Sequence, residues 1–206
     1  MTETPVMAPM VDRLVDGLTA SIVERGYRDT TVADIVRHAR TSKRTFYEHF
    51  AGKEQCLIEL LRRNNSDLID GIRAAVDPDD EWQVQIRSAV GAYVAHIRAR
   101  PAITLCWIRE APALGVVARP LNRQVMGDLT DLLVTVTQNP GFRRAGLTPV
   151  SPPLALILLG GLRELTAFIV EEGRDVEDIT EPAVAAATAL VTPQAGSQES
   201  HRPFTS

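Results

Sequence analysis

The residues best suited to chemistry lie in one stretch, TSKRTFYEHF, at positions 41–50. Read as a helix, the stretch puts Phe46 and Phe50 on one face, four residues apart, so both rings are expected to be buried. The other side chains are polar: Ser42, Lys43, Arg44, Thr45 and Glu48, with Tyr47 and His49 at the margins. Arg and Lys contact phosphates or guanine edges, and Ser, Thr and Tyr donate to phosphate oxygens. The stretch therefore indicates a helix that contacts a nucleic acid, and a solvated charged helix is the alternative.

The position of the charges favours contact with a polyanion at one surface. The chain of 206 residues has 22 Lys and Arg against 26 Asp and Glu, a net charge of −4, which argues against a protein that coats nucleic acid. Residues 37–53 depart from this balance, because they contain one acid, Glu48, and the bases Arg37, Arg40, Lys43, Arg44 and Lys53. The acidic excess lies elsewhere, mainly in 77–81 and 171–181. One basic face on an acidic protein limits anion binding to that face.

Helical periodicity places the stretch third in a run of helices. Apolar residues at three- and four-residue intervals from Met10 predict a first helix that ends near Gly26, with Tyr27 packed back beneath it. The segment 31–34, Thr-Val-Ala-Asp, is a capping box that opens a second helix, although its Thr hydroxyl and free amides could instead hold a phosphate. Arg40-Thr41 then forms a short turn. This order is that of a helix-turn-helix.

Residues 10–56 resemble the DNA-binding domain of TetR-type (tetracycline-repressor-like) transcriptional regulators. The resemblance is carried by the apolar stripe of the first helix and by Gly26-Tyr27, Thr31-Val32-Ala33-Asp34-Ile35, Ser42-Lys43, Thr45-Phe46-Tyr47, His49-Phe50 and Lys53-Glu54. It implies a sequence-specific DNA-binding regulator of transcription, a repressor that a small molecule releases from a palindromic operator. It also implies a homodimer on double-stranded DNA.

The sequence departs from the family pattern at three positions. Arg40 stands where the family most often has Gly, so a non-glycine residue must accept the turn conformation at some cost. Arg44 also replaces a frequent Gly and would bring a long guanidinium to the groove, so the operator need not resemble that of better-known relatives. Gly52 takes the position of the usual capping Ser, which is tolerable because Gly is an acceptable N-cap.

The resemblance implies a set of DNA-binding residues: Thr31, Arg40, Ser42, Lys43, Arg44, Thr45, Tyr47, His49 and Lys53. Lys43, Arg44 and Tyr47 would face the major groove, with Thr45 and Tyr47 near phosphates. Thr31 and Lys53 would hold phosphates at the N-termini of the second and fourth helices, where the helix dipole favours anions. Simple packing is the alternative for Tyr47, and simple capping for Thr31.

The predicted fold class is all-α, with an N-terminal three-helix helix-turn-helix DNA-binding domain joined to a larger helical ligand-binding and dimerisation domain. Apolar stripes predict a fourth helix from Lys53 towards Val76, and later helices whose ranges are 82–97, 102–114, 121–136, 154–169 and 182–191. A Pro/Gly loop is expected at 140–153. The predicted boundaries are a mobile N-terminus at 1–9, the DNA-binding domain at 10–53, the second domain at 54–191 and a disordered tail at 192–206.

The last two helices predict a dimer interface. They are apolar over much of their circumference, and their small residues allow helices to approach closely. A four-helix bundle of two such pairs across a two-fold axis would bury both faces, and core packing within one chain is the alternative. The residues expected at the interface are Leu158, Gly161, Leu165, Ala186 and Leu190.

The middle of the chain predicts a pocket for a small apolar or amphipathic ligand. Pockets are mostly apolar with a few placed polar groups. The candidate lining residues are Tyr93, His96, Trp107, Glu110, Met126, Arg163 and Phe168. An ordinary core with a polar surface is the alternative interpretation for each of them.

Other chemistry finds little support in the sequence, so no catalytic residue, metal or cofactor is predicted. Gly52-Lys53 lacks the rest of a phosphate-binding loop, no GxSxG, HExxH or paired-Cys signature occurs, and Cys56 and Cys106 are expected to be buried apolar side chains. A helical enzyme that uses Glu110 and His96, or a helical protein-interaction module without DNA activity, remains the alternative. The apolar run 154–162 is too short to cross a bilayer, and no apolar signal segment follows Met1, so a cytoplasmic protein without membrane contact is expected.

Overall fold

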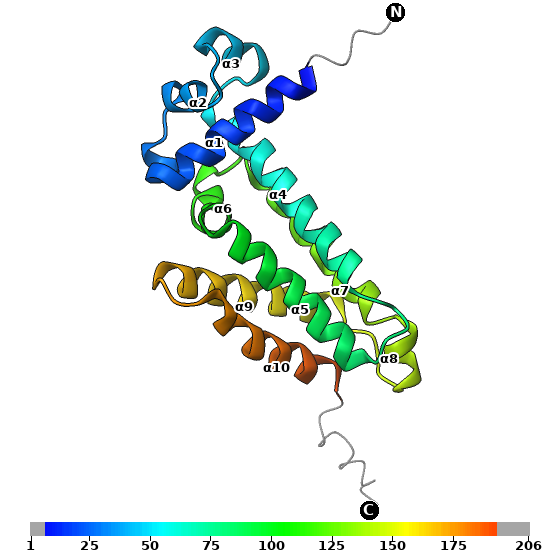
Figure 1. Ribbon diagram of the computed structural model, residues 1–206. Coiled ribbons are helices and arrows are strands. Elements are labelled where there is room, and N and C mark those ends of the chain that lie inside the picture. The colour runs from blue at the N-terminus through cyan, green and yellow to red at the C-terminus, as the bar shows by residue number, and fades with distance from the viewer. Residues whose placement is uncertain (1–6, 193–206) are drawn as a thin grey trace, which may run out of the picture.

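The computed structural model describes residues 7–192, and within that range every regular element is a helix (Figure 1). The all-α prediction is therefore confirmed. The predicted mobile N-terminus and disordered tail lie mostly outside the described residues. Residues 7–9, however, already belong to the first helix, α1 (Met7–Asp29), which corrects their assignment to a mobile segment. Pro9 is compatible with this early start, because a proline in the first helical turn removes no intrahelical hydrogen bond.

The predicted helix-turn-helix is confirmed as α1, α2 (Val32–His38) and α3 (Lys43–His49), which lie together at one end of the molecule (Figure 1). Gly26 interrupts α1 with φ 79° and ψ 162°, a conformation open mainly to glycine, and Tyr27 is buried directly after it. Phe46 is fully buried and Phe50 is 5% exposed, as the spacing of the two rings predicted. These local features follow from residue types that the sequence shows directly.

The remaining helices form an elongated body below this unit (Figure 1). Its elements are α4 (Lys53–Ala75), α5 (Trp82–Ala99), α6 (Pro101–Arg109), η1 (Ala111–Leu114), α7 (Arg119–Val136), α8 (Pro140–Arg144), α9 (Pro152–Glu171), η2 (Val176–Ile179) and α10 (Thr180–Val191). The helix expected at 102–114 ends at Arg109 and continues as a 3₁₀ turn, since Pro112 cannot donate to an α-helical bond. The loop expected at 140–153 contains α8, which begins at Pro140 and buries Phe142 completely.

A continuous hydrophobic core joins the helix-turn-helix to the body. It extends from the apolar side chains of α1, α2 and α3, such as Phe46, through the first half of α4 to Cys106 and Trp107 of α6. Helix α6 also packs directly against α1. Burial raises the pKa of the Cys56 and Cys106 thiols to about 12, in agreement with their predicted role as buried apolar side chains. The helix-turn-helix is thus held by α6 as well as by its covalent link to α4.

Helix α9 leaves much of its apolar surface uncovered. Leu156 is 50% exposed, Ile157 67% and Phe168 51%. By length and composition alone, Pro152–Glu171 could also cross a membrane, with a mean hydropathy of 1.7. One such helix is weak evidence for a membrane span, because core helices of soluble proteins pass the same test. The other faces of α9 pack against α6, α7 and α10, so this helix is part of the folded body.

The crossing of α1 and α2 depends on Gly17. A Cβ atom at this position would lie 2.6 Å from the carbonyl oxygen of Ile35 and 3.1 Å from Cβ of Ala39. Backbone on the partner helix cannot give way as a flexible side chain can. The absence of a side chain at Gly17 therefore sets how closely α2 approaches α1.

We predict that Gly17→Ala lowers the free energy of unfolding by about 1–3 kcal/mol, because the added methyl group forces the two helices apart. Gly71→Ala is the matched control. It lies on an exposed part of α4 with nothing within 4 Å of the added Cβ atom. It should be neutral or stabilising by up to about 1 kcal/mol, since Ala is the better helix former. Urea unfolding of both variants measures the difference, and equal stability would contradict the packing assigned to Gly17.

Candidate nucleic-acid interface and ligand cavities

The exposed end of α3 is held by a local cap and by two buried rings. The hydroxyl of Ser42 caps α3 by accepting a hydrogen bond from the backbone N–H of Thr45 at 3.1 Å. Phe46 and Phe50 anchor the helix from below, their ring centroids 5.7 Å apart. Lys43 and Arg44 then extend from the first turn into solvent, and the Arg44 side chain is 90% exposed. Its only ion-pair partner among the described residues is Glu48, at 3.1 Å. An exposed pair of this kind is weak and exchangeable, so Arg44 is free to meet another anion.

Tyr47, Thr45 and His49 occupy the borders of the same surface. Tyr47 is 58% exposed and packs edge-to-face on Phe46, with 5.4 Å between the ring centroids. Its ring thus combines packing with an accessible hydroxyl. Thr45 and His49 are half-buried, and the hydroxyl of Thr45 lies 3.0 Å from that of Ser42. The structure brings these side chains together with Ser42, Lys43 and Arg44, while their contact with DNA stays a prediction.

The turn before α3 is fastened from α1. Arg40 has φ 50°, the left-handed conformation that its position in place of a glycine predicted. The guanidinium of Arg13 donates to the carbonyl oxygens of Ala39 at 2.6 Å and Arg40 at 3.0 Å. Arg13 was not among the predicted site residues. Its sequence position on a regular amphipathic helix gives no signal, because its partners lie more than 25 residues away in the chain.

Thr31 is engaged in the capping box of α2. Its hydroxyl donates to the Asp34 carboxylate at 2.6 Å, its backbone N–H donates to the same carboxylate at 3.0 Å, and the Asp34 backbone N–H donates back to the hydroxyl. The two bonds from Thr31 lower the pKa of Asp34 to about 2. A carboxylate beside the hydroxyl disfavours a phosphate at the same point. Capping, the alternative interpretation, accounts for the geometry of Thr31, and its phosphate contact is not tested.

Lys53 performs a different task from the one predicted. Its ammonium group donates to the carbonyl oxygens of Thr30 at 2.8 Å, Tyr27 at 3.0 Å and Arg28 at 3.3 Å. It also lies 4.4 Å from the centroid of the Tyr27 ring. An ammonium has three protons, so these carbonyls use all of its donors. The Lys53 side chain therefore joins the end of α1 to the start of α4 in this structure, while its predicted phosphate contact stays a prediction.

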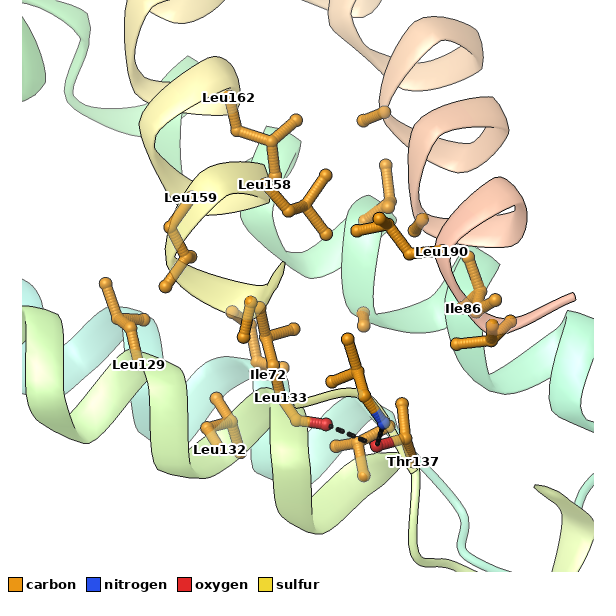
Figure 2. A pocket seen from close by; sticks show the side chains of 18 of the residues that line it. Ile72, Ile86, Leu129, Leu132, Leu133, Thr137, Leu158, Leu159, Leu162 and Leu190 are labelled. Carbon is orange, nitrogen blue, oxygen red and sulfur yellow. Dashed lines mark hydrogen bonds between the residues drawn. The ribbon is translucent and has the colours of Figure 1, made fainter. Parts of the chain in front are cut away.

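A second candidate site is an apolar cavity in the body, which we call the chamber. It lies between α4, α5, α7, α9 and α10, and Figure 2 shows leucines of α7 and α9 directed into it. The space open to the centre of a water-sized sphere is about 100 Å³. The hydroxyl of Thr137 at its edge is already bonded to the carbonyl oxygen of Leu133 and the N–H of Val150 (Figure 2). The chamber thus offers a ligand almost entirely hydrocarbon surface.

A smaller polar cavity, of about 60 Å³, adjoins the chamber. Tyr93, Leu129, Leu159 and Leu162 line both spaces. Of the predicted pocket residues, the polar cavity brings together Tyr93, His96, Trp107, Met126 and Arg163. The guanidinium of Arg163 lies 5.6 Å from the centroid of the Trp107 ring and donates to the carbonyl oxygen of Ile108 at 2.9 Å. Desolvation lowers the pKa of Arg163 and also that of His96.

Two predicted pocket residues lie elsewhere. The Glu110 carboxylate accepts two hydrogen bonds from Arg28, at 3.0 and 3.1 Å, and so joins the end of α6 to the end of α1. Phe168 is 51% exposed on the outer surface of α9. Both predictions are corrected, because a helical stripe does not reveal which of its faces meets a cavity. Leu158 and Leu190, which were predicted for the dimer interface, also line the chamber.

The five residues predicted for the dimer interface share one surface groove. Leu158, Gly161 and Leu165 of α9 and Ala186 and Leu190 of α10 all line it. Gly161 and Ala186 are exposed. The groove continues the uncovered apolar surface around Ile157, which also lines it. The structure thus places the predicted set on one accessible face, and its role in assembly is not tested.

Comparisons with known proteins agree with this architecture. Residues 14–60 match the model of the family described as bacterial regulatory proteins, tetR family. The HTH-type transcriptional activator FasR of Mycolicibacterium smegmatis is 31% identical over 71 residues, which are 34% of this chain and 32% of FasR. This chain therefore matches about a third of the length of that curated relative.

Two solved structures share the whole fold at low sequence identity. The fatty acid degradation regulator FadR of Bacillus halodurans has a TM-score of 0.72 at 19% identity, covering 89% of this chain and 96% of FadR. The regulator FadR of Bacillus subtilis, solved in complex with stearoyl-CoA, has a TM-score of 0.73 at 14% identity, covering 88% and 99%. At these identities the likeness concerns the fold alone.

We predict that Lys53→Met lowers the free energy of unfolding by about 1–3 kcal/mol, because it removes a charged donor from three carbonyl oxygens. Lys43→Met is the matched control. Lys43 is exposed at the start of α3, so its replacement should change stability by less than about 0.5 kcal/mol. Thermal or urea unfolding measures both. If Lys43→Met destabilises the protein as much as Lys53→Met, the role assigned to the Lys53 ammonium is wrong.

Proposed function

We propose that this chain, whose residues 14–60 match the model of the tetR family of bacterial regulatory proteins, is a sequence-specific DNA-binding regulator of transcription. The observation that carries the proposal is the exposed, basic first turn of α3 on a protein of net charge −4. Two buried rings and a serine cap fix this turn, so its side chains meet DNA in a set geometry. We propose further that the protein acts in the cytoplasm as a homodimeric repressor.

The alternatives have weaker support. A helical enzyme built on Glu110 and His96 would need the two side chains in one site. Glu110 instead pairs with Arg28 at the outer end of α6, whereas His96 lines the polar cavity. A protein-interaction module would not require the exposed cations of α3 to be separated from the protein's acidic segments. Selective binding to duplex DNA distinguishes the regulator from both.

Release by a small ligand is the second part of the proposal. The chamber and the polar cavity support an apolar or amphipathic compound, and a FadR of the same fold has been solved with stearoyl-CoA. A ligand releases DNA only if it binds better to a conformation whose two α3 helices no longer match the groove spacing. A coupling free energy of about 1–3 kcal/mol would weaken DNA binding roughly 5- to 150-fold.

Helices α4 and α6 both support such coupling. Asn64 and Leu68 of α4 and Thr104 and Trp107 of α6 line the polar cavity. The same helices contact α1, and the Arg28–Glu110 ion pair adds a polar link at the end of α6. A ligand that shifts α6 would therefore act on α1 directly. A tilt of α4, which also joins the polar cavity to the helix-turn-helix, would be a second route.

The direct test is selection of DNA sites from a random duplex pool, followed by measurement of affinity for the selected site. Arg44→Ala should weaken binding by about 1–3 kcal/mol and relax the preference at one base position, if its guanidinium is bidentate to a guanine. Arg73→Ala is the control, since Arg73 is an exposed α4 residue that pairs only with Asp70 among the described residues. Unchanged affinity and preference for Arg44→Ala would remove Arg44 from the interface.

The dimer is tested by placing charge in the α9–α10 groove. Gly161→Glu or Ala186→Glu should split the dimer, because each puts a carboxylate into a close apolar contact. Gly91→Glu, on the exposed side of α5 with nothing near its added Cβ atom, is the control. Light scattering reports the mass of each variant. A selected operator should also be a pseudo-palindrome, with half-sites about 34–36 Å apart. A wild-type monomer, or a site without inverted symmetry, would count against the homodimer.

A further inference from the structure

The polar cavity contains buried polar atoms that the described residues leave without a hydrogen-bond partner. These atoms are Oδ1 of Asn64, Nε2 of His96 and Oγ1 of Thr104. Asn64 is only 3% exposed and Thr104 only 9%. A buried polar group without a partner costs about 1–3 kcal/mol. Several such atoms at one cavity therefore indicate a surface that is complete only when a polar group occupies it.

Arg163 gives this cavity a positive charge without a carboxylate partner. Its hydrogen bonds go to uncharged oxygens, the closest being the carbonyl of Ile108 at 2.9 Å. The neighbouring Glu164 is held by Arg109, which also binds Glu171. Arg109 thereby engages the carboxylate of Glu164, which is adjacent to Arg163 in the chain. A half-buried guanidinium in this setting favours an anionic group that can accept its remaining protons.

The polar cavity lies beside the chamber, and the two spaces share part of their lining. Tyr93, Leu129, Leu159 and Leu162 border both spaces, and the hydroxyl of Tyr93 is turned aside to Thr166 at 2.7 Å. Beyond these side chains lies the chamber, in which the centre of a water-sized sphere can occupy a volume of about 100 Å³. One water needs about 10–15 Å³ of such space, so the chamber admits a chain of several carbon atoms. The two cavities together have a charged end and an apolar end.

We propose that the two cavities form one elongated site for an unbranched alkyl carboxylate, with the carboxylate in the polar cavity and the chain in the chamber. The proposed site depends on the proposed function in one respect: the compound would be the ligand that regulates DNA binding. Arg163 and the hydroxyl of Thr104 donate to the carboxylate oxygens. Asn64 donates through its amide nitrogen after rotation about its last side-chain bond, and His96 donates through Nε2–H in that tautomer.

The test compares ligands that share a chain and differ in the head group. Isothermal calorimetry on the full chain would use octanoate, dodecanoate and hexadecanoate, with dodecanol and dodecylammonium as head-group controls. Dodecanoate should bind about 10- to 100-fold more tightly than dodecanol, as expected for charge-assisted hydrogen bonds. Arg163→Met should remove that preference. Arg123→Met, which deletes an exposed guanidinium on α7, should keep it.

Further variants separate the two ends of the site and guard against misfolding. Thr104→Val conserves shape and should weaken dodecanoate several-fold without affecting dodecanol. Leu133→Trp narrows the chamber alone and should abolish the advantage of hexadecanoate over octanoate. Equal binding of dodecanoate and dodecanol to the wild-type protein, or unchanged binding to Arg163→Met and Thr104→Val, would overturn the proposal and leave a polar cavity filled by water.

Operator binding by the same ligand-free preparation keeps the two hypotheses apart. A preparation that selects a DNA site but binds none of these compounds overturns the alkyl carboxylate and leaves the DNA-binding regulator in place. A preparation that binds dodecanoate with the expected preference but selects no DNA supports the site and overturns the proposed function.

Discussion

The helix-turn-helix of this chain has a hydrophobic core that it does not complete by itself. A unit of roughly 40 residues buries a small share of its apolar surface and is at best marginally stable by itself. Here the core that contains Phe46 and Leu57 also contains Cys106 and Trp107 of α6. The orientation of α3 is therefore determined by packing in the body as well as by its own turn. Every other property of the proposed DNA surface depends on that shared core.

This packing gives one helix two sets of contacts. Trp107 belongs to the core shared with the helix-turn-helix and also lines the polar cavity. Protein interiors are close-packed and have low compressibility. A group that enters the cavity therefore displaces the side chains around it, and the displacement extends to the next helix. Just beyond Trp107, at the end of α6, Glu110 forms an ion pair with Arg28 of α1. A signal between the proposed sites needs to cross only this helix.

Much of the fold was predictable because it depends on the types of residues that are close together in the sequence. Gly26, the Thr31–Asp34 pair and the spacing of Phe46 and Phe50 each specify a conformation within a few residues, and each prediction is confirmed. The positive φ of Arg40 was expected from the family resemblance, since an arginine itself does not indicate this conformation. Such features need no knowledge of distant parts of the chain.

The sequence did not reveal the contacts of side chains whose partners are distant in the chain. Lys53 meets carbonyls 23 to 26 residues away, and Glu110 meets Arg28 at a separation of 82 residues. A lysine that faces DNA and one that locks two helices look alike in a sequence. The chamber raises the same difficulty, since leucines around a cavity follow the same helical spacing as leucines in a filled core. Only the relative positions of α4, α5, α7, α9 and α10 distinguish a cavity from a filled core.

The uncovered row of apolar side chains on α9, with Ile157 67% exposed, has a consequence for gene dosage. If a second copy covers this row, the amount of dimer rises with the square of the amount of monomer while monomer predominates. Operator occupancy would then respond to protein synthesis with a threshold steeper than simple proportion. Newly synthesised monomers would expose this apolar surface until they dimerise. At very low expression the monomers would persist longer and would be degraded by proteases more often. The same helix face would thus set both the sharpness of the response and the lifetime of the unassembled chain.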